Sequence, residues 1–303
     1  MVITLLGTGS PTPLPNRFGP SALIQAGGQT LLFDAGRGVP IRIHQLGVPL
    51  AKIDVLFLTH FHSDHTSGIP DVWLTRWVRT SGAMEATTPF NVIGPIGAKA
   101  LMSNLEKAYA DDIRIRMAAE PPPSPQGIAT SAMEFDRDGV VYEKGGVTVI
   151  AFKVDHGPAV KPAYGYRIEH VGRSVVLSGD TTYNENVIKY GVGADLLIHE
   201  VAAARPELMT DAHFQRIMRH HTIPERAGIV FSKARPKLAV YTHFILRSSA
   251  QVPEPTLEDV VAQTRRTYRG PLELGEDLMS FEVGEGVTVR RYKPQVQDQA
   301  SAI

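Results

Sequence analysis

The chain has 303 residues, and 43% of them are hydrophobic, so it is long and apolar enough to bury the core of one large α/β domain or of two smaller domains. Its 31 lysines and arginines balance 31 aspartates and glutamates. This balance excludes an overall basic charge of the kind that binds nucleic acids or membranes, although it leaves room for a local basic patch. There is no cysteine, so disulfides and thiolate ligands are excluded, and a metal site would consist of His, Asp and Glu.

The hydropathy of the chain gives no sign of a membrane protein. No apolar run approaches the roughly 20 residues that a membrane helix needs. The first residues, MVITLLGTGS, lack the basic start and the long apolar core of a signal peptide. We therefore expect a cytoplasmic protein without a membrane partner, unless a signal peptide has already been removed.

The first half of the sequence predicts β-structure followed by α/β structure. Glycine- and proline-rich loops separate short β-prone runs, and a continuous apolar run then predicts a buried strand. Strands are predicted over residues 2–6, 21–26, 29–33 and 53–58, and helices over 39–46, 69–78 and 98–109. The proline-rich run AAEPPPSPQGIATS (118–131) indicates a surface loop or an active-site lid. We expect residues 73–140 to form a lid or pocket segment.

The second half repeats this order. Strands are predicted over residues 147–154, 163–169, 174–177, 195–198 and 237–243, and helices over 185–190, 224–234 and 257–268. Thr222 and Glu225 have the spacing of a capping box at the start of the helix over 224–234. Two C-terminal strands follow, and the polar tail 294–303 is expected to be disordered. The repeated order predicts two sheets packed face to face with helices outside, in a single domain over residues 1–293.

The stretch LTHFHSDHTSG (58–68) concentrates metal-ligand residues directly after a predicted buried strand. His60 and His62 are two apart, so on an extended chain their side chains point the same way, and Asp64 and His65 follow as the chain turns. One ion cannot comfortably bind all four. The motif therefore indicates that these residues supply about half of the ligands of each of two neighbouring metal ions, as hydrolytic two-metal sites require. The alternative is that Asp64 caps a helix and the histidines are solvated loop residues.

Two four-coordinate ions need further ligands. His156, Asp180 and His243 each follow a predicted apolar strand. Each alone could be a capping or turn residue, but together they complete two shells. The assignment gives one ion to His60, His62 and His156 and the second ion to Asp64, His65 and His243, with Asp180 bridging the two.

The order of HFHSDH, His156, SGDT and the final TH resembles the metallo-β-lactamase superfamily, and LLGTGSP, LLFDAG and GYRI spread the resemblance over nearly the whole chain. The resemblance implies an α/β fold of the αββα sandwich type, with two mixed β-sheets flanked by helices. It also implies two zinc ions at one edge of the sheets and hydrolysis by a metal-bound hydroxide. Iron or manganese would also suit these ligands. Asp34 in FDAG has the motif position that supports the metal loop from behind.

The stretches LLIHEVA and HHTIPERAG resemble the tRNase Z-like branch of this superfamily. There the residues that match Glu200 and His221 form a proton-transfer pair beside the metals. An imidazole oriented by a carboxylate can deliver a proton to a poor leaving group, while Asp64 would bind metal and orient the nucleophile. The alternative is a buried Glu200–His221 hydrogen bond that only fixes the local connection.

The sequence leaves several functions open. The long form of tRNase Z carries a basic arm between the motifs GYR and GDT, whereas this chain has only a hairpin turn there. We therefore predict first a hydrolase of small or medium esters: a phosphodiester, or a sulfate ester or lactone as in arylsulfatase-like members. The alternative is a 3′-processing endoribonuclease acting on tRNA precursors. A further alternative is an iron-dependent dioxygenase or a ligand-sensing member of the fold.

Less specific signals concern substrate contacts and assembly. Trp73 and Trp77 are four apart on a predicted helix, a spacing more typical of core packing than of the substrate contact for which they are candidates. Arginines near the C-terminus could form a basic face or simply be solvated: Arg265, Arg266, Arg269, Arg290 and Arg291. The resemblance also makes a homodimer an expectation.

Overall fold

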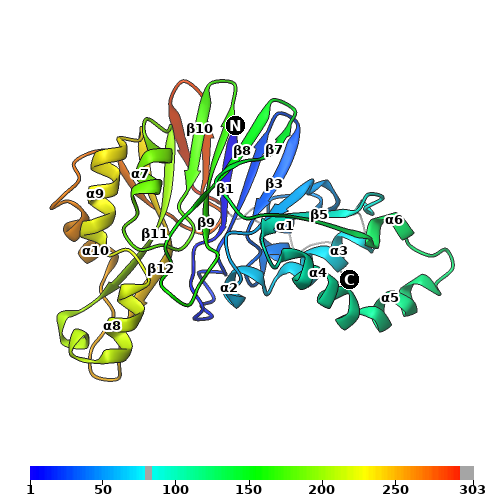
Figure 1. Ribbon diagram of the computed structural model, residues 1–303, viewed down its shortest axis with the longest axis horizontal. Helices are drawn as coiled ribbons and strands as arrows, with labels where there is room; N and C mark the ends of the chain where they lie inside the picture. Colours follow the sequence, from blue (N-terminus) through cyan, green and yellow to red (C-terminus); the bar gives the residue numbers. More distant parts are fainter. Residues whose placement is uncertain (79–83, 294–303) are drawn as a thin grey trace.

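A computed structural model describes residues 1–78 and 84–293 of the chain. Two β-sheets pack face to face, and helices cover their outer faces (Figure 1). The predicted αββα sandwich of two mixed sheets is confirmed. The tail 294–303, predicted to be disordered, lies outside the described residues. Within those residues, every helix is too short or too polar to cross a membrane.

The first sheet has eight strands, and its N-terminal strands alternate as expected for a half-buried sheet. Ile3 and Leu5 face the second sheet, whereas Leu6 faces the outer helices. Strands β15, β14, β1, β2 and β3 pair antiparallel, and β3 to β6 pair in parallel. The bounds are β1 Val2–Gly7, β2 Ser21–Ala26, β3 Gln29–Phe33, β4 Val55–Phe57, β5 Phe90–Pro95, β6 Thr130–Phe135, β14 Ser280–Val283 and β15 Val287–Arg290.

The second sheet has seven strands in the order β13-β12-β11-β10-β9-β8-β7. Strands β7 to β10 are antiparallel, and β10 to β13 are parallel. The parallel strands β11 and β12 are apolar and buried over most of their length, as expected for strands covered on both faces. The bounds are β7 Gly139–Lys144, β8 Val147–Lys153, β9 Tyr164–His170, β10 Arg173–Leu177, β11 Leu196–Ala204, β12 Leu238–Arg247 and β13 Leu272–Leu274.

Three apolar layers hold the sandwich together. Between the sheets, Phe33 stacks on Phe57 at 4.8 Å, and Tyr166 packs against both rings. The outer layer of the first sheet lies under α1 (Val39–Gln45), α3 (Ile69–Trp77) and α4 (Ala98–Ala108). The outer layer of the second sheet lies under α7 (Glu185–Gly191), α9 (Pro224–Ala234) and α10 (Leu257–Thr264). The remaining helices are η1 Leu50–Lys52, α2 Ser63–Thr66, α5 Ala110–Met117, α6 Pro125–Ile128, η2 Pro206–Thr210 and α8 Ala212–Arg219.

Residues 73–140 contain more regular structure than the sequence predicted. The segment supplies β5 and β6, two strands of the first sheet, together with α4, α5 and α6. β6 was missed because it is half-exposed and lacks an apolar run. Much of the segment is therefore part of the sheet and its covering helices.

The predicted capping box at Thr222 is wrong. The N-cap of α9 is Ile223, without a side-chain cap. The Thr222 hydroxyl instead donates to the Thr181 carbonyl at 2.6 Å, because this residue joins two loops across the sheet edge. A capping box does form at α10, between Thr256 and Asp259.

Candidate metal centre

The ligand-type residues of the first half lie where β4 ends at one edge of the sandwich. The chain leaves the strand at Phe57, and His62 is the N-cap residue of the single-turn helix α2, which contains Asp64 and His65. His60 is 0% exposed and His65 is 2% exposed. The polar cluster that follows this apolar strand is therefore buried, and each of its polar groups needs a hydrogen-bond partner, an opposite charge or a metal ion.

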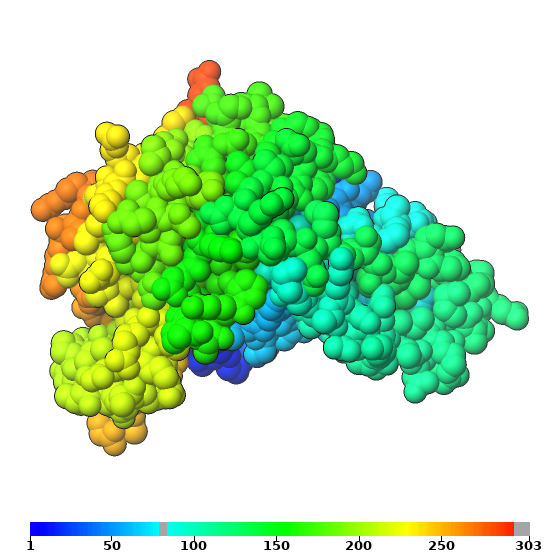
Figure 2. Space-filling view, viewed as in Figure 1, coloured from blue at the N-terminus to red at the C-terminus, as the bar shows by residue number. Residues whose placement is uncertain are grey.

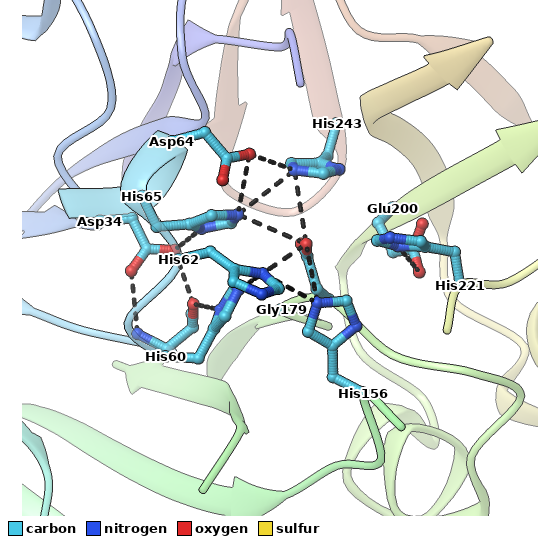
Figure 3. Close-up of polar contacts among 12 residues, drawn as sticks. Asp34, His60, His62, Asp64, His65, His156, Gly179, Glu200, His221 and His243 are labelled. Atoms are coloured by element: carbon cyan, nitrogen blue, oxygen red, sulfur yellow. Dashed lines mark hydrogen bonds and ion pairs between the residues drawn. The ribbon is translucent and has the colours of Figure 1, made fainter. Parts of the chain in front are cut away.

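The structure brings the seven predicted ligands together in adjoining groups. Figure 3 labels Asp64 and the five histidines of these groups. Asp180 lies between the groups. Its Oδ2 is 3.4 Å from the Nε2 atoms of both His65 and His243, 3.7 Å from His156 Nε2 and 3.9 Å from His60 Nε2. The first group is His60, His62, His156 and Asp180, and the second is Asp64, His65 and His243. A third group, Asp180, His221 and His243, shares residues with both.

Hydrogen bonds on the far side of each ring fix which nitrogen faces the centre. His60 Nδ1 lies 2.9 Å from Thr59 Oγ1, and His156 Nδ1 lies 2.8 Å from the His220 carbonyl oxygen. In the neutral rings Nδ1 donates these bonds, so both Nε2 atoms present lone pairs to the centre.

The third nitrogen of this group is His62 Nδ1, which lies 3.0 Å from His60 Nε2 and 3.2 Å from His156 Nε2. Ligand nitrogens about 2.0 to 2.1 Å from a tetrahedral zinc ion are about 3.3 Å apart. The spacing and the imidazole and carboxylate donors therefore fit zinc, and the same donors also suit iron or manganese.

Asp34 supports the cluster from behind, as the resemblance implied. It follows β3 with a φ of 55° and is 6% exposed. Its carboxylate accepts hydrogen bonds from the Thr59 amide at 2.8 Å, the Thr59 hydroxyl at 2.8 Å and His65 Nδ1 at 2.7 Å. Because these bonds fix both His65 and the backbone before His60, Asp34 links the two ligand groups.

Burial and neighbouring charges set the protonation of these groups. Burial, helped by His65, lowers the pKa of His60 well below its ordinary value. Burial opposes ionisation of Asp180, but His243 and His65 outweigh it and hold the pKa of this carboxyl well below its usual range. Burial also opposes the charged form of His65, but Asp180 and Asp34 outweigh it and raise its pKa well above the ordinary value. A cation that binds here would replace the His65 proton.

A β-bulge directs His243 into the cluster. Glu200 of β11 pairs with Thr242 of β12, and Val201 pairs with Phe244, so His243 is the extra residue, with a φ of 47°. We predicted that the strand ends at His243, but it continues to Arg247. A bulge depends on the neighbouring strand and leaves no local sequence signal.

Glu200 and His221 are also in contact, beside the ligand groups. Glu200 is 1% exposed, and its Oε1 accepts hydrogen bonds from the Thr181 and Thr222 amides and lies 3.2 Å from His221 Nδ1. Burial disfavours the charged form of His221, but Glu200, with smaller effects from other carboxylates, raises its pKa above the ordinary value. A ring nitrogen of His221 lies within 4.8 Å of ligand atoms of Asp180 and His243.

Trp73 and Trp77 do not face the centre. Both are 0% exposed, and their indole N–H groups donate to the carbonyl oxygens of Ile128 at 2.9 Å and Ser124 at 2.7 Å. The core-packing interpretation holds for both, and neither can contact a substrate in this structure. Two threonines whose role at the site was not predicted, Thr59 and Thr222, instead orient functional groups. The position of Thr59 directly before His60 was the available signal.

Comparison with solved structures identifies the fold. The fold matches the metallo-β-lactamase fold protein YhfI from Bacillus subtilis with a TM-score of 0.68 and 20% identity, over 93% of this chain and 99% of that chain. It matches the short form of human tRNase Z with a TM-score of 0.69 and 21% identity, over 94% of this chain and 100% of that chain. With its clustered metal-ligand residues, the protein is a metal-dependent hydrolase of the metallo-β-lactamase fold.

Sequence relatives define the family. Ribonuclease Z of Mycolicibacterium gilvum (strain PYR-GCK) is 38% identical over 299 residues, which cover 95% of this chain and 98% of that protein. A family model described as anti-Pycsar protein Apyc1 matches residues 1–227. The chain therefore belongs to the ribonuclease Z group of these hydrolases and to the family that the Apyc1 model describes. The resemblance to the tRNase Z-like branch is confirmed.

Proposed function

We propose that this protein is an endoribonuclease of the tRNase Z type, which removes the 3′ trailer of tRNA precursors with two bound zinc ions. The similarity to ribonuclease Z carries the proposal, because 38% identity extends over 95% of this chain and 98% of that protein. This is the alternative predicted from the sequence, and the comparison favours it over the first prediction of a small-ester hydrolase. Zinc ions, when bound, would supply an activated water and positive charge for the developing oxyanion.

The ligand set that we propose is His60, His62 and His156 for one ion and Asp64, His65 and His243 for the other, with Asp180 shared. Strands of both sheets lead to these residues, so the proposal treats residues 1–293 as one catalytic domain. Asp64 Oδ2 lies 3.2 Å from His243 Nε2. In this position the Asp64 carboxylate would bind the same ion as His243 and orient the attacking water.

His221 would donate a proton to the leaving group. Its Nδ1 is held by Glu200, which leaves Nε2 free to point toward the substrate. Glu200 itself accepts two backbone N–H bonds, so its orientation is fixed before a substrate binds. The ribose hydroxyl that leaves in RNA cleavage is a poor leaving group, and therefore depends on such a donor.

A second candidate is hydrolysis of a small or medium phosphodiester or related ester. The observation that favours it is the connection between β9 and β10, which consists of Val171 and Gly172 and leaves no long arm to grip tRNA. The family model that matches residues 1–227 is also named for an anti-Pycsar protein and not for a ribonuclease.

The test is kcat/KM of one zinc-loaded preparation on a 3′-extended tRNA precursor and on a small aryl phosphodiester, at fixed salt concentration. The proposal expects cleavage at the 3′ end of the mature tRNA, with kcat/KM several orders of magnitude higher for the RNA. Efficient cleavage of the small diester with no cleavage of the RNA would contradict the proposal and favour the second candidate.

A further inference from the structure

The short turn between β9 and β10 raises the question of which surface would hold an RNA. β-Sheet register pairs His170 with Arg173, so only Val171 and Gly172 connect the strands, both with positive φ. Phosphate contacts from lysine and arginine supply much of the affinity for nucleic acids. An RNA that reaches the metal centre therefore needs a basic surface elsewhere on this protein.

Of the five C-terminal arginines that the sequence suggested as a basic face, three pair with carboxylates: Arg266, Arg290 and Arg291. Arg290 pairs with Glu282 at 2.6 Å, and Arg291 pairs with Glu273 at 2.9 Å. Arg265 is half-buried and donates to the Gly270 carbonyl oxygen, whereas Arg269 is exposed. Exposed pairs of this kind leave little net positive charge for phosphates.

Helix α8 presents basic residues that are not neutralised in this way. His213, Arg216 and Arg219 are exposed, and half-buried His220 follows at the C-terminal end. Their spacing puts these four residues, which we name the α8 basic face, on one side of the helix. The other side, with Met218, packs on β11 and β12. Within residues 1–78 and 84–293, neither arginine forms an ion pair with a carboxylate oxygen within 4.0 Å, and Arg216 hydrogen-bonds His213 Nδ1 at 3.3 Å.

The α8 basic face adjoins the metal centre. The His220 carbonyl oxygen accepts the hydrogen bond from His156 Nδ1, and the His220 ring packs against Gly157. The ring centroids of His220 and His156 lie 6.2 Å apart, so the C-terminal end of the face is at the edge of the site. In Figures 1 and 2 the segment around α8 projects from the lower left of the molecule, at the end of the sandwich where α2 also lies.

We propose that the α8 basic face binds the phosphates of the RNA strand that enters the metal centre, in place of an arm between β9 and β10; this rests on the function proposed above. An eight-residue helix is about 12 Å long, enough to follow roughly three phosphates at 3.4 Å rise. Two carboxylates lie at the N-terminal end of α8, away from His220: Asp211, which caps the helix, and Glu207 in the preceding η2. Arg216 and Arg219 make the face basic, and Asp155 is the carboxylate that acts on His220 where the face meets the site.

The experiment compares the double variant Arg216→Gln/Arg219→Gln with a matched double variant, Arg266→Gln/Arg269→Gln, which removes two exposed arginine charges at the end of α10. For each, kcat/KM on a tRNA precursor is divided by kcat/KM on a small aryl phosphodiester, and the affinity for the same RNA is measured by fluorescence anisotropy from 0.05 to 0.5 M NaCl. Loss of two phosphate contacts should lower RNA affinity about 25- to 60-fold at 0.1 M salt and reduce the salt slope by about 1.4 to 1.8. The α10 variant should retain the wild-type ratio, affinity and slope.

The outcomes separate this inference from the proposed function. If the wild type cleaves the precursor and the α8 variant keeps the wild-type ratio and slope, the α8 basic face is not the RNA surface, although the ribonuclease function stands. If the wild type binds RNA through α8 without cleaving it, the surface stands and the ribonuclease function fails. If the wild type neither binds nor cleaves RNA, both are overturned. An equal loss in both double variants would also overturn the inference, because it would reflect total charge alone.

Discussion

Replacement of Asp180 by asparagine tests the residue that lies between the two ligand groups of the metal centre. The Asp180 carboxylate is buried, and its Oδ2 lies 3.4 to 3.9 Å from nitrogen atoms of four histidines in the two ligand groups. The substitution keeps the size of the side chain but removes its charge. Each proposed ion would lose its anionic bridging ligand and retain three protein ligands.

The expected loss follows from this shared position. Removing a group that only supports a metal ligand typically costs about 10- to 100-fold in metal affinity. Loss of a direct ligand should cost at least the upper end of this range for each ion, about 100-fold or roughly 3 kcal/mol. We therefore expect the variant to lose both ions to a chelator concentration that the wild type withstands, and to lose turnover in parallel.

Metal content by mass spectrometry and zinc affinity by competition with a chromophoric chelator would measure this effect, with circular dichroism to establish that the variant is folded. Asp155→Asn is the matched control, because Asp155 is exposed and adjoins His156 without belonging to either ligand group. Two tightly bound zinc ions in a folded Asp180→Asn protein would refute the bridging assignment.

Three further predictions address the groups around the centre. Asp34→Asn should weaken zinc binding about 10- to 100-fold and lower the free energy of unfolding by about 1 to 3 kcal/mol, since three hydrogen bonds converge on this carboxylate; unchanged zinc affinity by chelator competition would contradict its supporting role. His221→Ala should lower kcat about 10²- to 10⁴-fold on RNA but less than about tenfold on a p-nitrophenyl diester, whose leaving group needs no proton; equal losses on both substrates would argue against proton donation. Removal of metal by a chelator should lower the melting temperature by roughly 6 to 8 °C per site relative to protein with free zinc at 1,000 times Kd, and calorimetry with zinc added back would show whether the loss is reversible.

The sequence by itself determined the composition of the candidate centre. Four of its ligand-type residues lie within six positions of each other, and the other three follow apolar strands, so local patterns were enough to find all seven. The two-sheet architecture was also predictable, because period-two and continuous apolar runs report burial locally. The proximity of these residues was therefore predictable from the sequence.

Tertiary structure decided the features that depend on segments far apart in the chain. β11 was predicted to end before His199, since polar residues interrupt its apolar run, yet pairing with β12 extends it through Glu200 to Ala204. The bulge that turns His243 inward exists only because the register of these two strands shifts. The exposure of the arginines on α8, like the pairing of those near the C-terminus, likewise depends on which carboxylates the fold brings close. Residue pattern reports whether a segment is buried, but the direction and charge environment of a side chain are set by neighbours that only the folded chain supplies.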